Sequence, residues 1–201
     1  MYKIIGFPRT RAMRVIWILE ELGEPYELNP ALPHSDAVTS LTTDGKVPIL
    51  VTDGTALTDS VAICTYLADK SGRFTFPAGT LDRARQDSFT QLGVDVLEGA
   101  LWTAAKNTFI HPEEVRVPAV KEVCRMEFAR GLKTLEQRFG DGPFVMGETF
   151  TIADIIIGHC FSWAMAAKFE LPKDGPLAGY IKRLSERPAF QAMMAKVMEA
   201  A

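Results

Sequence analysis

The chain has 201 residues, of which 47% are hydrophobic and 23% are charged, and this composition is typical of one large or two small globular domains. It carries 22 Lys and Arg residues against 25 Asp and Glu residues, and the resulting net charge of −3 argues against nucleic acid as a partner. Because no long uninterrupted apolar run is present and the first residues do not resemble a secretory leader, we expect no membrane span.

The cysteines are odd in number, lie far apart and fall within apolar helical patterns; they are Cys64, Cys124 and Cys160. We therefore expect buried, reduced thiols rather than disulfides or metal ligands, and a cytoplasmic location. His111 and His159 have no partners at metal-ligand spacing, so we assign no metal.

The first 75 residues predict strands and helices in the order βαβ followed by ββα. Apolar residues recur at helical spacing after the first strand, and Gly23 stands where a C-terminal cap belongs. The pair Asp53-Gly54 signals a tight hairpin. Residues 30–45 are irregular, with one helical turn at most. We expect strands over residues 3–7, 25–29, 47–51 and 56–58, and helices over 11–22 and 60–70.

Residues 76–81 lack periodicity and contain Gly and Pro, so we predict a linker there between a domain over 1–75 and a domain over 82–201. The second domain shows no convincing strand. One of its helices has an explicit start, because Thr151 and Asp154 form a capping box. We expect helices over residues 82–108, 118–139, 176–186 and 188–199, and one that follows Thr151.

Four stretches of the sequence together resemble the soluble glutathione S-transferase family, and the similarity covers nearly the whole chain. They are RTRAMRVIWILEELGEPYEL, GKVPILVTDG, LTDSVAICTYLA and GETFTIADI, in this order. The first is most similar to bacterial and fungal members that have Ser-Arg at the start of the first helix. The resemblance implies a thioredoxin-like N-terminal domain followed by an all-helical C-terminal domain. It also implies a cytoplasmic homodimer that uses glutathione as co-substrate and needs no other cofactor.

The resemblance further implies a glutathione site around the third strand. In the family the bond before Pro48 is cis, and Val47 would offer its backbone N–H and C=O to an extended peptide. Ser60 and the amides of its helix would hold the γ-glutamyl carboxylate, and Asp59 would hold the ammonium group. The glycyl carboxylate would meet Lys46 and His34. Taken alone, Val47-Pro48 can begin an edge strand and Asp59-Ser60 can be a helix cap. Their occurrence together favours the glutathione site.

The chain departs from better-known members at the position that activates the thiol. Phe7 stands where tyrosine-type members have a hydroxyl, and Thr10 is the only side-chain hydroxyl in the following turn. A hydrogen-bond donor or a helix N-terminus near sulfur favours the thiolate. We predict Thr10 as the donor, with Arg9 and Arg11 as charged alternatives and backbone amides as a third source. The chain has no CxxC motif, which excludes a dithiol mechanism.

Three aromatic residues are candidates to line the electrophile pocket, although packing within the helical domain explains them equally well; they are Trp102, Phe109 and Trp163. The electrophile cannot be named, because pocket side chains vary freely on one fold. A glutathione-dependent disulfide reductase or peroxidase on the same site is an alternative to the transferase. A non-enzymatic binding or assembly module is another, and the intact Val47-Pro48 and Asp59-Ser60 pairs argue against it.

Overall fold

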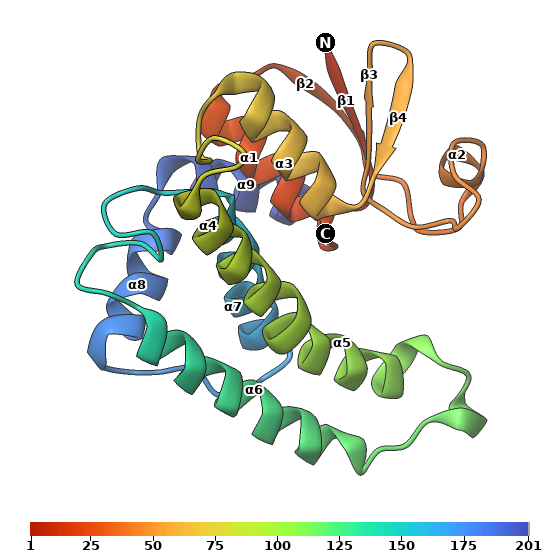
Figure 1. The fold of residues 1–201 in the computed structure, drawn as a ribbon. Coiled ribbons are helices and arrows are strands. Elements are labelled where there is room, and N and C mark those ends of the chain that lie inside the picture. The colour runs from red at the N-terminus through yellow and green to blue at the C-terminus, as the bar shows by residue number, and fades with distance from the viewer. Residues whose placement is uncertain (201) are drawn as a thin grey trace. The chain divides into compact units, whose positions relative to one another are not determined.

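The computed structural model describes residues 1–200, and these form two compact units (Figure 1). The first unit contains residues 1–77 together with the segment from Ser185 to the C-terminal end, and the second contains residues 78–184. Each unit has its own core. The thioredoxin-like and all-helical parts that the resemblance implied correspond to these two units.

A four-stranded mixed sheet forms the centre of the first unit. Its strands β1 (Tyr2–Ile5), β2 (Tyr26–Asn29), β3 (Ile49–Thr52) and β4 (Thr55–Thr58) lie in the order β2-β1-β3-β4. Strand β1 runs parallel to β2 and antiparallel to β3, and β3 and β4 form a hairpin. The predicted βαβ-ββα order is therefore confirmed.

Two strand ends differ from the prediction by two residues, each for a backbone reason. Strand β3 begins at Ile49 rather than at Val47, because Pro48 has no N–H to donate to a ladder. Strand β1 ends at Ile5 rather than at Phe7. The next residue, Gly6, has a φ of 155°, a conformation that side-chain-bearing residues rarely adopt.

Helices cover both faces of this sheet. Helices α1 (Ala12–Leu22) and α3 (Ser60–Ser71) pack together on one side of it, and the short α2 (Asp36–Thr39) lies on the other side (Figure 1). The single helical turn predicted within residues 30–45 is α2, and its Val38 packs against Ile5 and Ile49. Helix α1 ends at Gly23, which adopts the left-handed conformation expected of a C-terminal cap.

Helix α9 (Pro188–Glu199) packs with the first unit, although the predicted second domain extended to residue 201. The ring of Phe190 meets Trp17 of α1 edge-on, with ring centroids 4.9 Å apart. Arg187 donates two hydrogen bonds to the Glu21 carboxylate, at 2.6 and 2.7 Å. These contacts explain why residues 185–200 group with the N-terminal part of the chain.

The second unit is built from helices. A continuous helical rod runs through α4 (Leu81–Gln91), η1 (Leu92–Glu98), α5 (Gly99–Ala105) and η2 (Lys106–Ile110). The rod matches the helix predicted over 82–108, but η1 and η2 have π-helical hydrogen bonding. The remaining elements are the 3₁₀ turn η3 (Glu113–Val115) and helices α6 (Val120–Arg138), α7 (Ile152–Ala166) and α8 (Gly175–Ser185).

The buried start of α7 is organised by Asp154. The carboxylate accepts hydrogen bonds from the Thr151 N–H at 2.8 Å, the Tyr180 hydroxyl at 2.7 Å and the Val145 N–H at 3.1 Å. The predicted capping box is therefore present. Burial raises the pKa of Asp154 to about 6, because removal from water costs the charged form more than these donors return.

The three cysteines are free thiols in buried positions, as the sequence predicts. Burial raises the pKa of the Cys64 thiol to about 12. None of the helices in residues 1–200 combines the length and the apolarity that crossing a lipid bilayer requires.

Candidate functional site

Three segments of the first unit come together where the sheet meets its helices. In the hairpin, Ile49 pairs with Thr58, so Val47-Pro48 and Asp59-Ser60 leave the two strands beside each other. A Cβ atom placed on Gly6 would lie 3.1 Å from the Cβ of Val47 and 3.3 Å from that of Ala12. The end of β1, the approach to β3 and the start of α1 therefore meet at Gly6.

The segment before β3 presents an unpaired strand edge. The Val47–Pro48 peptide bond is cis. The Val47 side chain is half-buried against the cluster that contains Ile5, Val38 and Ile49. Across residues 1–200, the backbone N–H and C=O of Val47 have no hydrogen-bond partner. A strand edge of this kind pairs with an extended peptide.

Asp59 caps helix α3 in a strained conformation. Its φ is 68°, which is uncommon for a residue with a side chain and often marks a functional site. One oxygen, Oδ1, accepts from the N–H groups of Val61 and Ala62 at 2.9 and 3.0 Å. The exposed carboxylate keeps Oδ2 for a cation, so capping and ammonium binding are compatible roles.

Ser60 is tied to a residue that the sequence reasoning missed. Its hydroxyl oxygen accepts a hydrogen bond at 3.1 Å from Nη1 of Arg14, and the two residues are only 2% and 1% exposed. The Sγ of Cys64 donates to the backbone carbonyl of Arg14 at 3.6 Å. The sequence does contain a signal for a special role of this residue, because Arg14 is the only charged residue in the buried run Ala12–Leu19.

Thr10 lies in the turn before α1 and its hydroxyl is already engaged. It donates to the Phe7 carbonyl at 2.7 Å and accepts from the Ala12 N–H at 3.2 Å. Activation of a thiol by Thr10 stays a prediction, and it requires the Thr10 hydroxyl to give up its hydrogen bond to the Phe7 carbonyl.

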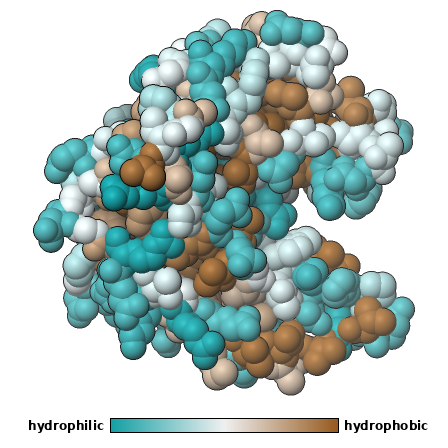
Figure 2. Space-filling view, in the orientation of Figure 1, coloured by the Kyte–Doolittle hydropathy of each residue, from teal (hydrophilic) through white to brown (hydrophobic). Residues whose placement is uncertain are grey.

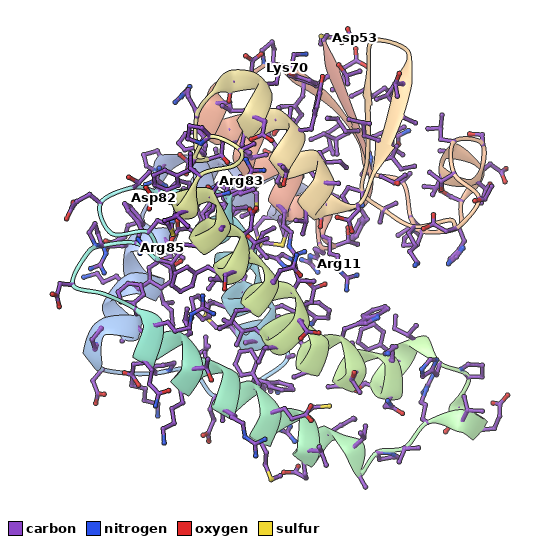
Figure 3. The ribbon with its side chains drawn as sticks, viewed as in Figure 1. Arg11, Asp53, Lys70, Asp82, Arg83 and Arg85 are labelled. Atoms are coloured by element: carbon purple, nitrogen blue, oxygen red, sulfur yellow. The ribbon has the colours of Figure 1, made fainter. Side chains whose placement is uncertain are left out.

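The two arginines of this turn differ in exposure: Arg9 is exposed and Arg11 is half-buried. Arg11 lies at the opposite end of the first unit from the Lys70–Asp53 ion pair, whose atoms are 3.9 Å apart (Figure 3).

His34 and Lys46 belong to one exposed loop of the first unit. The His34 N–H donates to the carbonyl of Gly45 at 2.8 Å. A Cβ on Gly45 would come within 2.2 Å of the His34 ring, so the ring packs directly over this glycine. The Nζ of Lys46 lies 3.9 Å from an oxygen of Asp44. The structure thus brings together the two residues predicted to meet the glycyl carboxylate.

The aromatic candidates lie in the second unit, and two of them touch. The rings of Trp102 and Trp163 meet edge-on with centroids 6.3 Å apart, and Trp163 also meets His159 at 6.0 Å. Phe109 lies on η2 and is 64% exposed. Other exposed apolar side chains lie near the end of the rod and at the start of α6, where Figure 2 shows separate brown areas at lower right; they are Ile110, Val115, Val117, Val123 and Met126.

Among the side chains of residues 1–200, no group of three or more His, Cys, Asp or Glu residues is arranged to hold a metal ion. The residues predicted to bind glutathione lie in the first unit, at one end of its sheet. The aromatic residues predicted to line the electrophile pocket belong to the second unit.

Comparison with known proteins gives consistent matches over both units. Residues 5–74 match the family described as "Glutathione S-transferase, N-terminal domain", and residues 94–191 match "Glutathione S-transferase, C-terminal domain". The chain is 28% identical over 183 residues to glutathione S-transferase GstA of Escherichia coli O157:H7, with 86% of this chain and 87% of that protein covered.

Solved structures show the same fold. A glutathione transferase from Methylococcus capsulatus superposes with a TM-score of 0.82 at 25% identity, covering 98% of this chain and 100% of that one. Ure2p5 from Phanerochaete chrysosporium, cocrystallized with 1-(S-glutathionyl)-2,4-dinitrobenzene, superposes with a TM-score of 0.84 at 18% identity. The match covers 99% of this chain and 95% of Ure2p5.

Proposed function

The chain belongs to the glutathione S-transferase family and is a glutathione transferase, and from that premise we propose that the end of its first unit binds glutathione and activates the thiol for attack on a small hydrophobic electrophile. Glutathione is an extended peptide with a carboxylate and an ammonium group at its γ-glutamyl end. The observation that carries the proposal is the unpaired backbone of Val47 beside Asp59 and Ser60.

Each part of the peptide has a chemically matched partner in this region. The backbone of Val47 pairs with the cysteinyl residue as one more strand would. The exposed carboxylate of Asp59 attracts the ammonium group, and the hydroxyl of Ser60 donates to the γ-glutamyl carboxylate. Lys46 and His34 lie in the loop that meets the glycyl carboxylate at the other end of the peptide.

The cysteinyl sulfur of a peptide bound in this way lies near the start of α1. A free thiol has a pKa of about 8.5, so little of it is ionised at neutral pH. The N-terminus of α1, the charges of Arg9 and Arg11 and the hydroxyl of Thr10 all favour the anion. The thiolate then forms a bond to the electrophilic carbon, and the leaving group departs with the electron pair of the bond that breaks.

We propose a flat aromatic ring as the electrophile, and Trp102 and Trp163 as the surface that takes it. The edge-on pair of tryptophans supports this assignment, as does the dinitrophenyl conjugate bound to Ure2p5. Phe109 is the third candidate, from its exposure on η2. Detoxification of such compounds in the cytoplasm, by a homodimer, completes the proposal. The 22.2 kDa chain should sediment at twice its mass, and a monomer at tens of micromolar would count against the dimer.

Calorimetry with glutathione tests the site. Wild-type protein should bind with a free energy of roughly −4 to −8 kcal/mol, corresponding to millimolar to micromolar affinity. Ser60→Ala should weaken binding by about 1 to 3 kcal/mol through loss of a charge-assisted hydrogen bond. Ser71→Ala is the matched control, because Ser71 lies at the other end of α3 and its hydroxyl donates to the Ala68 carbonyl.

Folded wild-type protein that gives no binding heat would refute the proposal. Turnover with 1-chloro-2,4-dinitrobenzene, mixed disulfides and peroxides then separates the transferase from a glutathione-dependent disulfide reductase or peroxidase on the same site. Disulfide or peroxide turnover without conjugation of the aromatic halide would replace the transferase assignment.

A further inference from the structure

The C-terminal end of α1 carries two acidic residues, Glu20 and Glu21, and its last turn, residues 19–22, contains no basic residue. The carbonyl groups at this end of a helix carry partial negative charge, so cations are favourable there and carboxylates are not. Arg73, which follows α3, donates to the backbone carbonyls of Glu21 and Leu22 at 3.3 and 3.2 Å. The two carboxylates take their cations from elsewhere.

The C-terminal segment of the chain supplies these cations. Nε and Nη2 of Arg187 donate to the two carboxylate oxygens of Glu21 at 2.6 and 2.7 Å. The Glu21 side chain is only 8% exposed, and it also accepts from Nε1 of Trp17 at 3.0 Å. The Nζ of Lys196, on α9, lies 3.9 Å from Oε1 of Glu20. Because two-point contacts between arginine and carboxylate are among the stronger polar interactions in proteins, docking of α9 neutralises the end of α1.

Helix α1 also depends on α9 for its burial. Its residues Ala12–Leu19 are all buried, so α1 is covered on every side rather than along one stripe. Both α3 and α9 pack on it within the first unit, and the Phe190 ring of α9 lies against Trp17, which is fully buried. Undocking of α9 would expose apolar surface of α1 and remove the arginine from Glu21. The two helices should therefore open as one unit.

The other end of α1 meets the thiol in the proposed site. Thr10 and Arg11 directly precede this helix, and its first residue, Ala12, lies against Gly6 beside Val47. A helix of 11 residues is about 16 Å long and moves as one body. Displacement of its C-terminal end is therefore transmitted to its first turn.

We propose that docking of α9 on α1 controls the glutathione site, so that docking and glutathione binding favour each other. With α9 docked, α1 is held where its first turn meets the thiol, and bound glutathione in turn stabilises the docked state. The inference rests on the proposed glutathione site. Arg187 is then a positioning residue, which acts through Glu21 from the opposite end of α1.

A contact that only stabilised the fold would behave differently. Helix α9 would then open and close independently of glutathione, and loss of Arg187 would lower the free energy of unfolding without changing the affinity for the peptide. If the two events are coupled, each must favour the other by the same factor, and the affinity falls with the fraction of molecules in the docked state. Amide hydrogen exchange in α9 reports its undocking and so separates the two cases.

The experiment measures hydrogen exchange with and without saturating glutathione, and glutathione dissociation constants, for the full-length wild type and for Arg187→Glu and Arg187→Lys. In wild type, glutathione should slow exchange in α9 by about fivefold or more, and exchange in α6 by less than about twofold. Arg187→Glu places like charges together, so it should quicken exchange in α9 and weaken glutathione binding by about fivefold or more. Arg187→Lys keeps the charge but not the planar fork, so it should fall between the two.

The matched control is Arg183→Glu, because Arg183 also donates through Nε, to the Pro143 carbonyl, but belongs to α8 of the second unit. It should leave exchange in α9 and the affinity unchanged. Unchanged affinity in Arg187→Glu, or equal slowing of exchange in α6 and α9, would overturn the inference while leaving the glutathione site intact. If Arg187→Glu does not fold, the exchange comparison in wild type decides alone. Absence of glutathione binding by wild type would instead refute the proposed function.

Discussion

Replacement of Thr10 with alanine tests how the thiol is activated. In the structure the hydroxyl proton of Thr10 goes to the Phe7 carbonyl at 2.7 Å, a bond between neutral groups. Donation to a thiolate requires that bond to break. The outcome therefore depends on whether the anionic sulfur is a better acceptor than the carbonyl by enough to redirect the proton.

Typical hydrogen-bond free energies favour donation to the thiolate over donation to the Phe7 carbonyl. A neutral hydrogen bond contributes about 0.5–1.5 kcal/mol, whereas one to a charged group contributes about 1.5–3 kcal/mol. The exchange from carbonyl to thiolate should gain about 1 kcal/mol, which corresponds to somewhat less than one pKa unit. Thr10→Ala should therefore raise the pKa of the bound glutathione thiol by somewhat less than one unit. At a pH below that pKa, turnover should fall by a factor approaching about ten. Thr10→Ser should keep both values.

Stability gives a separate readout of the same variant. Thr10 also accepts the N–H of Ala12 at 3.2 Å, in the manner of a helix cap. Loss of the hydroxyl should lower the free energy of unfolding by about 1 kcal/mol whether or not it acts on the thiol. Ultraviolet absorbance of the thiolate, titrated with glutathione bound to each variant, reports the pKa directly. An unchanged pKa in Thr10→Ala, with an increase in Arg9→Gln or Arg11→Gln, would refute the reasoning and assign activation to charge.

Two further predictions concern stability. Asp154 has a native pKa of about 6, above its unfolded value of 3.8, so its stabilising contribution is complete below pH 3.8 and is lost as the pH rises through about 6. The free energy of unfolding of wild type, relative to Asp154→Asn, should therefore fall by at most about 3 kcal/mol between these values, and a flat difference in urea melts would contradict this. Glu21→Gln should cost about 2 kcal/mol, because it weakens the paired bonds from Arg187 that dock α9, and an unchanged urea midpoint would show that α9 does not depend on them.

The order of elements was predictable because its signals are local. Apolar periodicity located α1, α3 and α6 to within two residues, and Gly23 and the Asp53-Gly54 pair marked a helix end and a hairpin. The π-helical stretches of the rod and the docking of α9 on α1 were not predicted. The docking of α9 depends on contacts between elements distant in sequence, which a pattern read along one segment does not contain.

The candidate site was predictable in part for the same reason. Val47-Pro48 and Asp59-Ser60 lie beside each other as the resemblance implied, because the register of the β3–β4 hairpin joins them. The engagement of Thr10 with Phe7 depends on the geometry of one turn, and the bond from Arg14 to Ser60 spans 46 positions of sequence. Neither has a sequence signature beyond the isolation of Arg14 among buried apolar residues.

The proposed glutathione site lies where this fold leaves backbone groups unpaired. Strand β3 cannot begin before Pro48, so the N–H and C=O of Val47 stay available, and Gly6 lets β1 end close enough to support them. Both features belong to the backbone of the first unit, and replacement of Pro48 or Gly6 would change them. Trp102 and Trp163, the residues proposed to take the electrophile, are side chains on helices of the second unit. Change in electrophile preference should therefore arise by substitution in the second unit while glutathione binding by the first is retained.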